Sequence, residues 1–212
     1  MKNVGVAILG TLAMLMSIEP SMRARNATAG TVQIGSDGTA DTDARVANPV
    51  MRPIRTGQTN SFDKTDDGDL KNGTEWPNPR FTDNDDGTVT DNITGLVWLK
   101  DPYIYRHKNW SRSLVKCRKM RHGKKNLTDG SVEGDWRMPN LRELQSLIDY
   151  GQYDPALPPR HPFINVDIGH YFTSTIMAGR TQDVWTVRIL DGAVVSNNKS
   201  GSGKVWPVRD AR

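Results

Sequence analysis

The spacing of apolar residues predicts a helix in the middle of the chain. Trp110, Leu114, Cys117 and Met120 recur at intervals of four, three and three residues, as expected for one face of an α-helix. The intervening positions are mostly polar or basic. This segment should therefore pack on a core through one face and present the other to water.

A second helix is predicted to begin after Asn140. The side chain of Asn140 can accept a hydrogen bond from the free backbone N–H groups of the first turn, and Glu143, three residues later, completes a capping box. The buried face of this helix would consist of Leu141, Leu144, Leu147 and Ile148.

Strands are expected before the helices. Residues 80–82 and 88–90 are β-prone and flank Asp83-Asn-Asp-Asp-Gly87, whose glycine can supply the positive φ of a tight turn. The segment is therefore predicted to be a hairpin, and residues 93–99 are predicted to continue it as a short buried strand.

Strands are also expected after the helices, at 171–175, 184–190, 193–196 and 205–208. Asp191-Gly192 is the commonest kind of two-residue hairpin signal, and Pro207 indicates an edge strand or a bulge. Two helices packed on short antiparallel sheets, with the first and last strands available to pair, make an α+β domain. The tryptophans at strand and loop junctions should lie mostly in its core: Trp98, Trp136, Trp185 and Trp206.

The amino-terminal residues 1–29 have the composition of a cleaved signal peptide. A basic start at Lys2 precedes an apolar run, and Ala27 and Ala29 form the small-residue pattern of a cleavage site. The run is shorter than the roughly 20 residues that span a bilayer as a helix. We therefore expect an extracytoplasmic protein, periplasmic or secreted, with no transmembrane segment in the mature chain; an uncleaved anchor is the alternative.

Residues 30–69 are rich in Gly, Thr, Asp and Asn and contain only isolated apolar residues. Such a composition buries too little surface to offset the entropy of ordering, so a flexible polar lead-in is expected before a domain at 70–212. Cys117 is the only cysteine, which excludes an internal disulfide and leaves stability to packing. Its apolar neighbours favour a small buried hydrophobic side chain.

Two motifs resemble a known family. They are Arg80-Phe-Thr-Asp-Asn-Asp-Asp-Gly-Thr-Val-Thr-Asp-Asn-Ile-Thr-Gly-Leu-Val-Trp98 and Gly134-Asp-Trp-Arg-Met-Pro-Asn-Leu-Arg-Glu-Leu144. Both resemble the extracytoplasmic Lcl C-terminal domain family, named after a bacterial collagen-like surface adhesin, and the similarity extends from about Thr56-Gly-Gln-Thr59 to Arg209. The resemblance implies a C-type-lectin-like fold and an adhesin-like module. The calcium-dependent sugar-binding motifs of C-type lectins, Glu-Pro-Asn and Trp-Asn-Asp, do not occur in the sequence.

Basic residues are concentrated at 106–125, a segment without any acidic residue, although the formal net charge of the chain is only +4. They are Arg106, Lys108, Arg112, Lys116, Arg118, Lys119, Arg121, Lys124 and Lys125. Because no neighbouring carboxylate neutralises them, these charges should face water or a polyanion.

A basic stripe with helical spacing can bind sulfated or uronic-acid polysaccharide, lipopolysaccharide phosphates or nucleic acid through salt-sensitive contacts. We expect an anionic polysaccharide or cell-surface polymer and do not expect nucleic acid. The candidate ligand-binding residues are Arg106, Lys108, Arg112, Lys116, Lys119, Lys124 and Lys125. The alternative is a solvated face, neutralised by carboxylates elsewhere in the fold such as Asp135, Glu143 or Asp149.

Four aspartates form a second cluster: Asp83, Asp85, Asp86 and Asp91. Calcium takes six to eight oxygen ligands, so it is the metal that this cluster suggests. The spacing does not follow an EF-hand, and aspartates are common in turns because they hydrogen-bond their own backbone. We prefer the turn interpretation, expect no cofactor, and keep a calcium site as the alternative.

No catalytic residue is predicted, because His107 and His122 belong to the basic segment, and His161 and His170 flank a loop with no cysteine or Gly-x-Ser-x-Gly nucleophile near it. The sequence thus predicts an exported, non-enzymatic binding module that attaches to an anionic glycan or cell-surface polymer through a basic helix. A structural or protein-interaction module of the cell envelope, contacting its partner through the loop at 197–203, is the second hypothesis. A hydrolase of unknown type is the third.

Overall fold

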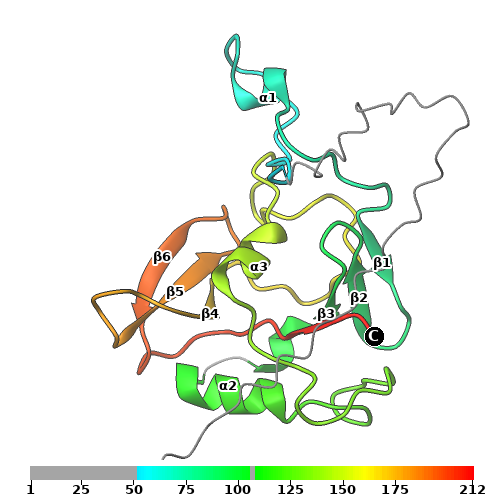
Figure 1. Ribbon diagram of the computed structural model, residues 1–212, viewed down its shortest axis with the longest axis vertical. Helices are drawn as coiled ribbons and strands as arrows, with labels where there is room; N and C mark the ends of the chain where they lie inside the picture. Colours follow the sequence, from blue (N-terminus) through cyan, green and yellow to red (C-terminus); the bar gives the residue numbers. More distant parts are fainter. Residues whose placement is uncertain (1–51, 106–107) are drawn as a thin grey trace, which may run out of the picture. The chain divides into compact units, whose positions relative to one another are not determined.

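The computed structural model describes residues 52–105 and 108–212, which belong to a compact unit spanning Pro49–Arg212 (Figure 1). The predicted signal peptide at 1–29 and the first part of the predicted lead-in lie outside the described residues. In the part of the chain that the structure describes, no helix is long and apolar enough to cross a membrane.

The elements follow in the order α1 (Asp67–Leu70), β1 (Phe81–Asp83), β2 (Thr88–Asp91), β3 (Leu96–Leu99), the 3-10 helix η1 (Pro102–Tyr105), α2 (Trp110–Arg118), α3 (Leu141–Ser146), β4 (His170–Ile176), β5 (Asp183–Arg188), β6 (Val194–Asn198) and β7 (Val208–Asp210). The strands form two antiparallel sheets, ordered β1-β2-β3-β7 and β4-β5-β6. In Figure 1, α3 lies between the two sheets, and the segment leading into β7 crosses from the side of β6 to reach β3. The unit is α+β with mostly β structure, as predicted.

The predicted first hairpin is confirmed as β1 and β2, in which Phe81 lies opposite Asp91. Gly87 in its turn has a φ of 86°, and a Cβ there would lie 2.8 Å from the backbone oxygen of Asn126, so glycine is required twice over. The last strand, β7, pairs with β3 and not with the first strand, because β2 occupies only one edge of β3 and leaves the other open.

A buried ion pair joins this first sheet to α3. Arg80 Nε donates to Asp91 Oδ1 at 2.9 Å, and Arg80 Nη2 donates to the backbone oxygen of Ser146 at 2.6 Å. The two side chains are 7% and 0% exposed. Asp91 also accepts hydrogen bonds from the backbone N–H of Ile93 and the hydroxyl of Thr94. One charge-assisted cluster therefore fixes the start of β1, the turn after β2 and the end of α3.

Aromatic side chains fill the core beside the first sheet. Trp206 is fully buried, and the rings of Trp98 and Phe163 lie edge-on to it with centroids at 6.1 and 4.8 Å. This edge-to-face arrangement is the preferred one for aromatic pairs. The core role predicted for the tryptophans is confirmed for these two and for Trp136, which is also fully buried, whereas Trp185 is only partly buried.

The two-residue turn predicted at Asp191-Gly192 is wrong. The backbone N–H groups of Ile189 and Leu190, which precede it, donate to the carbonyl oxygens of Gly169 and Ile168 at 3.1 and 2.9 Å. Ile189 is also fully buried. Because these residues pair with the segment entering β4, the connection between β5 and β6 is longer than the sequence predicted.

Residues 52–69, assigned by sequence to the flexible lead-in, make specific contacts with the compact unit. Ile54 pairs with Thr74, and the carbonyl oxygen of Thr56 accepts a hydrogen bond from the backbone N–H of Tyr150 at 2.8 Å. Backbone hydrogen bonds compensate here for the scarcity of apolar side chains. The compact unit accordingly begins well before residue 70.

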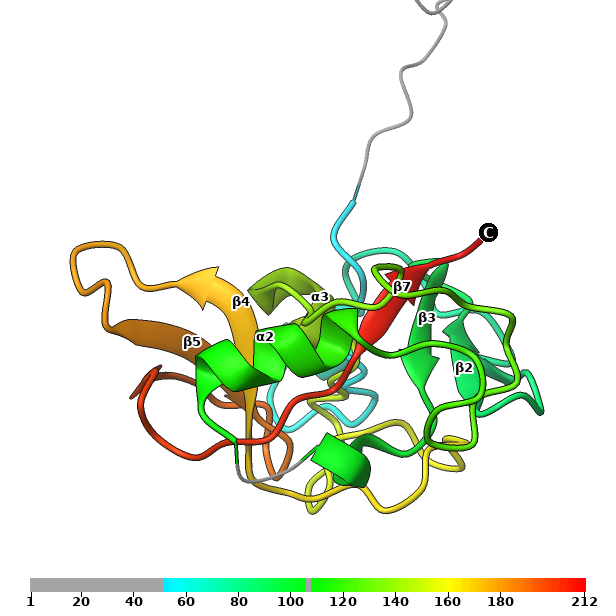
Figure 2. The same cartoon turned by 90° about the horizontal axis from the view of Figure 1, so that it is seen from below.

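Both predicted helices are present, and they use the faces that the sequence indicated. Leu114 and Cys117 of α2 pack in a small cluster with Phe172 and Val205, and burial raises the pKa of Cys117 to about 12. Figure 2 shows α2 at the front of the unit with α3 behind it. The polar face of α2 is thereby left exposed.

The capping box of α3 is confirmed: Asn140 Oδ1 accepts from the backbone N–H of Glu143 at 2.9 Å, and Glu143 Oε2 accepts from that of Asn140 at 2.8 Å. Asn140→Ala should lower the free energy of unfolding by about 1 kcal/mol, because the backbone N–H of Glu143 loses its partner. Urea denaturation measures this loss. Arg142→Ala, on the exposed side of the same turn, should change it by less than about 0.5 kcal/mol; equal losses for both variants would contradict the assignment.

Arg80→Met should lower the free energy of unfolding by about 3–5 kcal/mol, because it leaves Asp91 buried without a counter-charge. Adding Asp91→Asn removes that charge, keeps one oxygen that can accept from Ile93, and places an amide that can donate to the hydroxyl oxygen of Thr94. The double variant should therefore be more stable than Arg80→Met alone in the same urea titration. A double variant that is no more stable would show that the buried charge is not what makes Arg80 necessary.

Candidate functional site

The basic residues of 108–125 form an exposed surface on α2 and the loop after it, here called the basic face. Arg112, Lys116 and Lys119 are separated by four and three residues, so they lie on the same side of the helix, and all three are exposed. Leu114 and Cys117 point the opposite way, into the core. Lys124 and Lys125 continue the exposed surface in the loop, while Arg106 lies outside the described residues.

Carboxylates of the described residues leave most of this face unneutralised. Arg121 is paired, with Nη1 at 2.8 Å from Glu133 Oε2. Among the residues described, no ion pair to a carboxylate is formed by Lys108, Arg112, Lys116, Arg118, Lys119, Lys124 or Lys125. The basic face therefore carries a concentrated positive charge.

The carboxylates considered as alternative partners of the basic face are engaged elsewhere. Asp135 pairs with Arg212, and Glu143 pairs with Arg137, whose pKa is raised chiefly by the hydrogen bond from its guanidinium to that carboxylate. Asp149 accepts its hydrogen bond from a backbone N–H group far from α2 in the sequence. These three carboxylates therefore form no ion pair with the described cations of the basic face.

A shallow depression of about 400 Å³ lies on the basic face, lined by Lys108, Ser111, Arg112, Val115 and Lys116. Val115 is 52% exposed, so the lining of the depression combines an apolar side chain with three cations. Sequence reasoning missed a further cation near it: the backbone N–H of Trp110 donates to Lys199 O at 3.1 Å, and Lys199 Nζ lies 4.8 Å from the Trp110 ring centroid. No local pattern could have identified Lys199, because only the fold brings it to the start of α2.

The four aspartates of 83–91 make separate contacts. Asp83 accepts a hydrogen bond from Lys100, which is the main reason that its pKa is lowered. Asp86 accepts from the backbone N–H two residues later, Asp91 belongs to the buried ion pair, and Asp85 is an exposed turn residue. Across 52–105 and 108–212, no three His, Cys, Asp or Glu side chains are grouped so that they could hold a metal ion. The four aspartates are thus engaged separately, Asp85 and Asp86 in the turn and Asp83 and Asp91 in ion pairs.

The loop at 197–203 borders a smaller depression, of about 310 Å³. The side-chain amides of Asn197 and Asn198 donate to Thr186 Oγ1 at 2.8 Å and to Asp183 Oδ1 at 3.2 Å. These amides hold the loop on β5, so the surface that the loop presents is made mainly by its glycines and serines.

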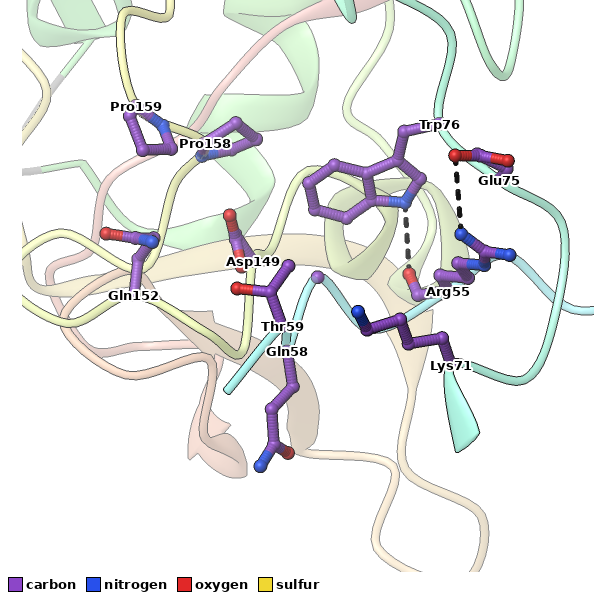
Figure 3. A pocket seen from close by; sticks show the side chains of 11 residues that line it. Arg55, Gln58, Thr59, Lys71, Glu75, Trp76, Asp149, Gln152, Pro158 and Pro159 are labelled. Carbon is purple, nitrogen blue, oxygen red and sulfur yellow. Dashed lines mark hydrogen bonds and ion pairs between the residues drawn. The ribbon is translucent and has the colours of Figure 1, made fainter. Parts of the chain in front are cut away.

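A pocket of about 400 Å³ that sequence reasoning missed lies where the segment at 55–59 meets the chain after α3 (Figure 3). It is lined by Arg55, Gly57, Gln58, Thr59, Lys71, Glu75, Trp76, Asp149, Gln152, Pro158 and Pro159. Residues widely separated in the sequence contribute to it. The motif Thr56-Gly-Gln-Thr59 was the only local signal that pointed here.

Asp149 is the buried acid of this pocket, with 3% of the residue exposed. Its Oδ1 accepts a hydrogen bond from the backbone N–H of Gly151 at 2.8 Å, whereas its Oδ2 has no donor among the described residues. Burial raises the pKa of Asp149, against the opposing effect of the positive charge of Arg80. In Figure 3 its carboxyl group is drawn below Pro158 and to the left of the indole of Trp76.

Gly57 is required for this geometry. Its φ is 93°, and a Cβ at this position would lie 2.2 Å from Asp149 Oδ1 and 2.6 Å from Trp76 Cη2. Any side chain here would displace the acid or the indole, so the glycine lets the two lie next to the same backbone segment.

Comparison with protein families matches residues 87–209, more than half of the 212-residue chain, to the Lcl C-terminal domain. The matched range includes α2, α3, the β4-β5-β6 sheet and Asp149. Among curated proteins, none matches the chain at a significant level. The chain therefore belongs to the Lcl C-terminal domain family, a family of adhesin-associated modules.

Proposed function

We propose that the protein is an exported, non-enzymatic binding module with a C-type-lectin-like fold, and that it attaches to an anionic glycan or another anionic cell-surface polymer through the basic face. The observation that carries this proposal is the exposure of seven basic residues without carboxylate partners among the described residues. A bound polyanion would supply the missing counter-charge. Membership of an adhesin-associated family supports attachment to a surface.

The geometry of α2 suits an extended charged polymer. The helix has nine residues, which gives it a length of about 13 Å, and its three aligned cations follow that length. Lys108 precedes the helix, and Lys124 and Lys125 follow it. The positive potential therefore extends along a line, which favours a chain-like ligand over a single small anion.

The anchoring of the helix also favours binding. Leu114 and Cys117 fix the inner face of α2 in the core, and Asn109 caps its first turn by accepting from the backbone N–H of Arg112 at 3.0 Å. The cations thus project from a rigid element, so less conformational entropy is lost when they bind.

A protein-interaction module of the cell envelope is the second candidate. The depression of about 310 Å³ beside 197–203 favours it, since glycine and serine backbone groups there could pair with a partner chain. The two functions differ in their response to salt, because ionic contacts with a polyanion weaken steeply with ionic strength and a mostly apolar interface does not.

The triple variant Arg112→Glu, Lys116→Glu, Lys119→Glu should bind immobilised heparin at least about tenfold more weakly than the wild type at low salt, because three adjacent contacts become repulsive. Retention of the wild type should fall steeply along a salt gradient. The matching glutamine variant, which adds no carboxylate near the carboxyl end of α2, should show a smaller loss in the same direction. Surface plasmon resonance on heparin measures both.

A control with the same change in net charge separates local binding from overall charge. Lys64, Arg142 and Arg160 are exposed and lie outside the basic segment 108–125. Their reversal to glutamate should weaken heparin binding much less than the first triple variant. Equal losses, or binding unchanged by the first variant, would refute the proposed role of the basic face, and circular dichroism checks that each variant is folded.

A further inference from the structure

We propose that the pocket at Trp76 and Asp149 is a second binding site, and that its ligand is a neutral saccharide whose adjoining sugar units contact the exposed aromatic residues beside the pocket. This site is distinct from the basic face and uses a different chemistry. Three features of the pocket favour such a ligand: its balanced charge, its free acceptor and its aromatic surface.

The formal charges of the pocket lining balance. Arg55 and Lys71 contribute two positive charges, and Glu75 and Asp149 two negative charges, with Arg55 Nη1 at 3.5 Å from Glu75 Oε1. A sulfate or carboxylate ligand would meet the Asp149 carboxylate, and an ammonium ligand would meet Lys71. A neutral ligand with hydroxyl groups avoids both repulsions and can donate to the acid as well as accept from the amine.

The free acceptor is Asp149 Oδ2. The residue is 97% buried, its other carboxylate oxygen is already used by Gly151, and no donor among the described residues reaches Oδ2. Because Asp149 lines the pocket, a ligand or water there can supply a donor to this oxygen. A sugar hydroxyl is such a donor, and the side-chain amide of Gln152 also lines the pocket for a neighbouring hydroxyl.

The apolar surface of the pocket suits the C–H face of a sugar ring. Trp76 is held in place because its Nε1 donates to the backbone oxygen of Arg55 at 3.0 Å and the Arg80 guanidinium lies 4.4 Å from its ring centroid. Pro158 and Pro159 form the other side of the pocket (Figure 3). A ring with one apolar face and peripheral hydroxyls can contact this surface and Asp149 together.

An adjoining depression of about 370 Å³ extends the site beyond one sugar unit. It shares Gln58 and Gln152 with the first pocket, so the two are contiguous. Three aromatic side chains line it and are largely exposed: Phe62 at 83%, Tyr150 at 47% and Tyr153 at 70%. Clustered exposed aromatic rings are typical of a ligand groove, and here they lie where further units of a saccharide chain would pass.

Saturation-transfer NMR on the full chain tests the proposal with a panel of neutral sugars: glucose, galactose, mannose, N-acetylglucosamine, cellobiose, lactose and chitobiose. At least one should bind with a dissociation constant on the order of millimolar or tighter. Binding should persist in roughly 0.5 M salt and in the Arg112, Lys116, Lys119 triple variant, because no net charge is involved. A panel in which nothing binds, or binding that is lost with the basic face, would overturn the proposal.

Asp149→Asn is the decisive variant. It keeps an oxygen for Gly151 but places an amide where the free acceptor stood, so saccharide affinity should fall about tenfold or more. Its stability to urea should be unchanged or higher at pH 7, since the raised pKa means that folding disfavours the ionised carboxyl. Asp85→Asn, at an exposed turn, is the matched control and should bind like the wild type.

The indole provides an independent readout. Trp76→Phe keeps an aromatic face and should retain most of the affinity, whereas Trp76→Ala should lose it. If Asp149→Asn and Trp76→Ala both bind saccharide as tightly as the wild type does, the pocket is not the binding site.

Discussion

The buried ion pair of Arg80 and Asp91 is the interaction on which the arrangement of the unit depends. Cys117 is free, so no disulfide joins segments that are far apart in the sequence. This ion pair and the aromatic core join them instead. Arg80 links the first hairpin to the end of α3 through Ser146, and its guanidinium also lies against Trp76. The charge that organises the fold therefore also positions one wall of the pocket and faces Asp149.

The two proposed binding surfaces differ in what they lack. The basic face lacks counter-charge, because the carboxylates that could neutralise it are engaged by Arg137, Arg212 and backbone groups. The pocket at Trp76 has balanced charge, but no donor among the described residues reaches Asp149 Oδ2. Unneutralised positive charge selects a polyanion through long-range, salt-sensitive attraction, whereas a free acceptor in a pocket selects a hydroxylated ligand through short-range geometry. A surface glycan can present both features along one chain.

Local signals predicted the elements well, because each depends on a few consecutive residues. Apolar spacing predicted α2, and Asn140 with Glu143 predicted the start of α3. Contacts between distant segments were not predictable, since no local pattern reports that Lys199 reaches the start of α2 or that Gly57 lies against Asp149. The basic residues themselves could be identified from the sequence. Their lack of carboxylate partners could not, because it depends on where the fold places the acids.

The central claim is that the basic face, and not the loop at 197–203, is where a polyanion binds. The most direct test follows backbone amide chemical shifts of isotope-labelled protein as a heparin-derived oligosaccharide is added. We predict that the largest shifts occur at 108–125, with small changes at Arg80, Trp76 and Asp149. Largest shifts at 197–203 or around Asp149, with residues 108–125 unaffected, would contradict this account.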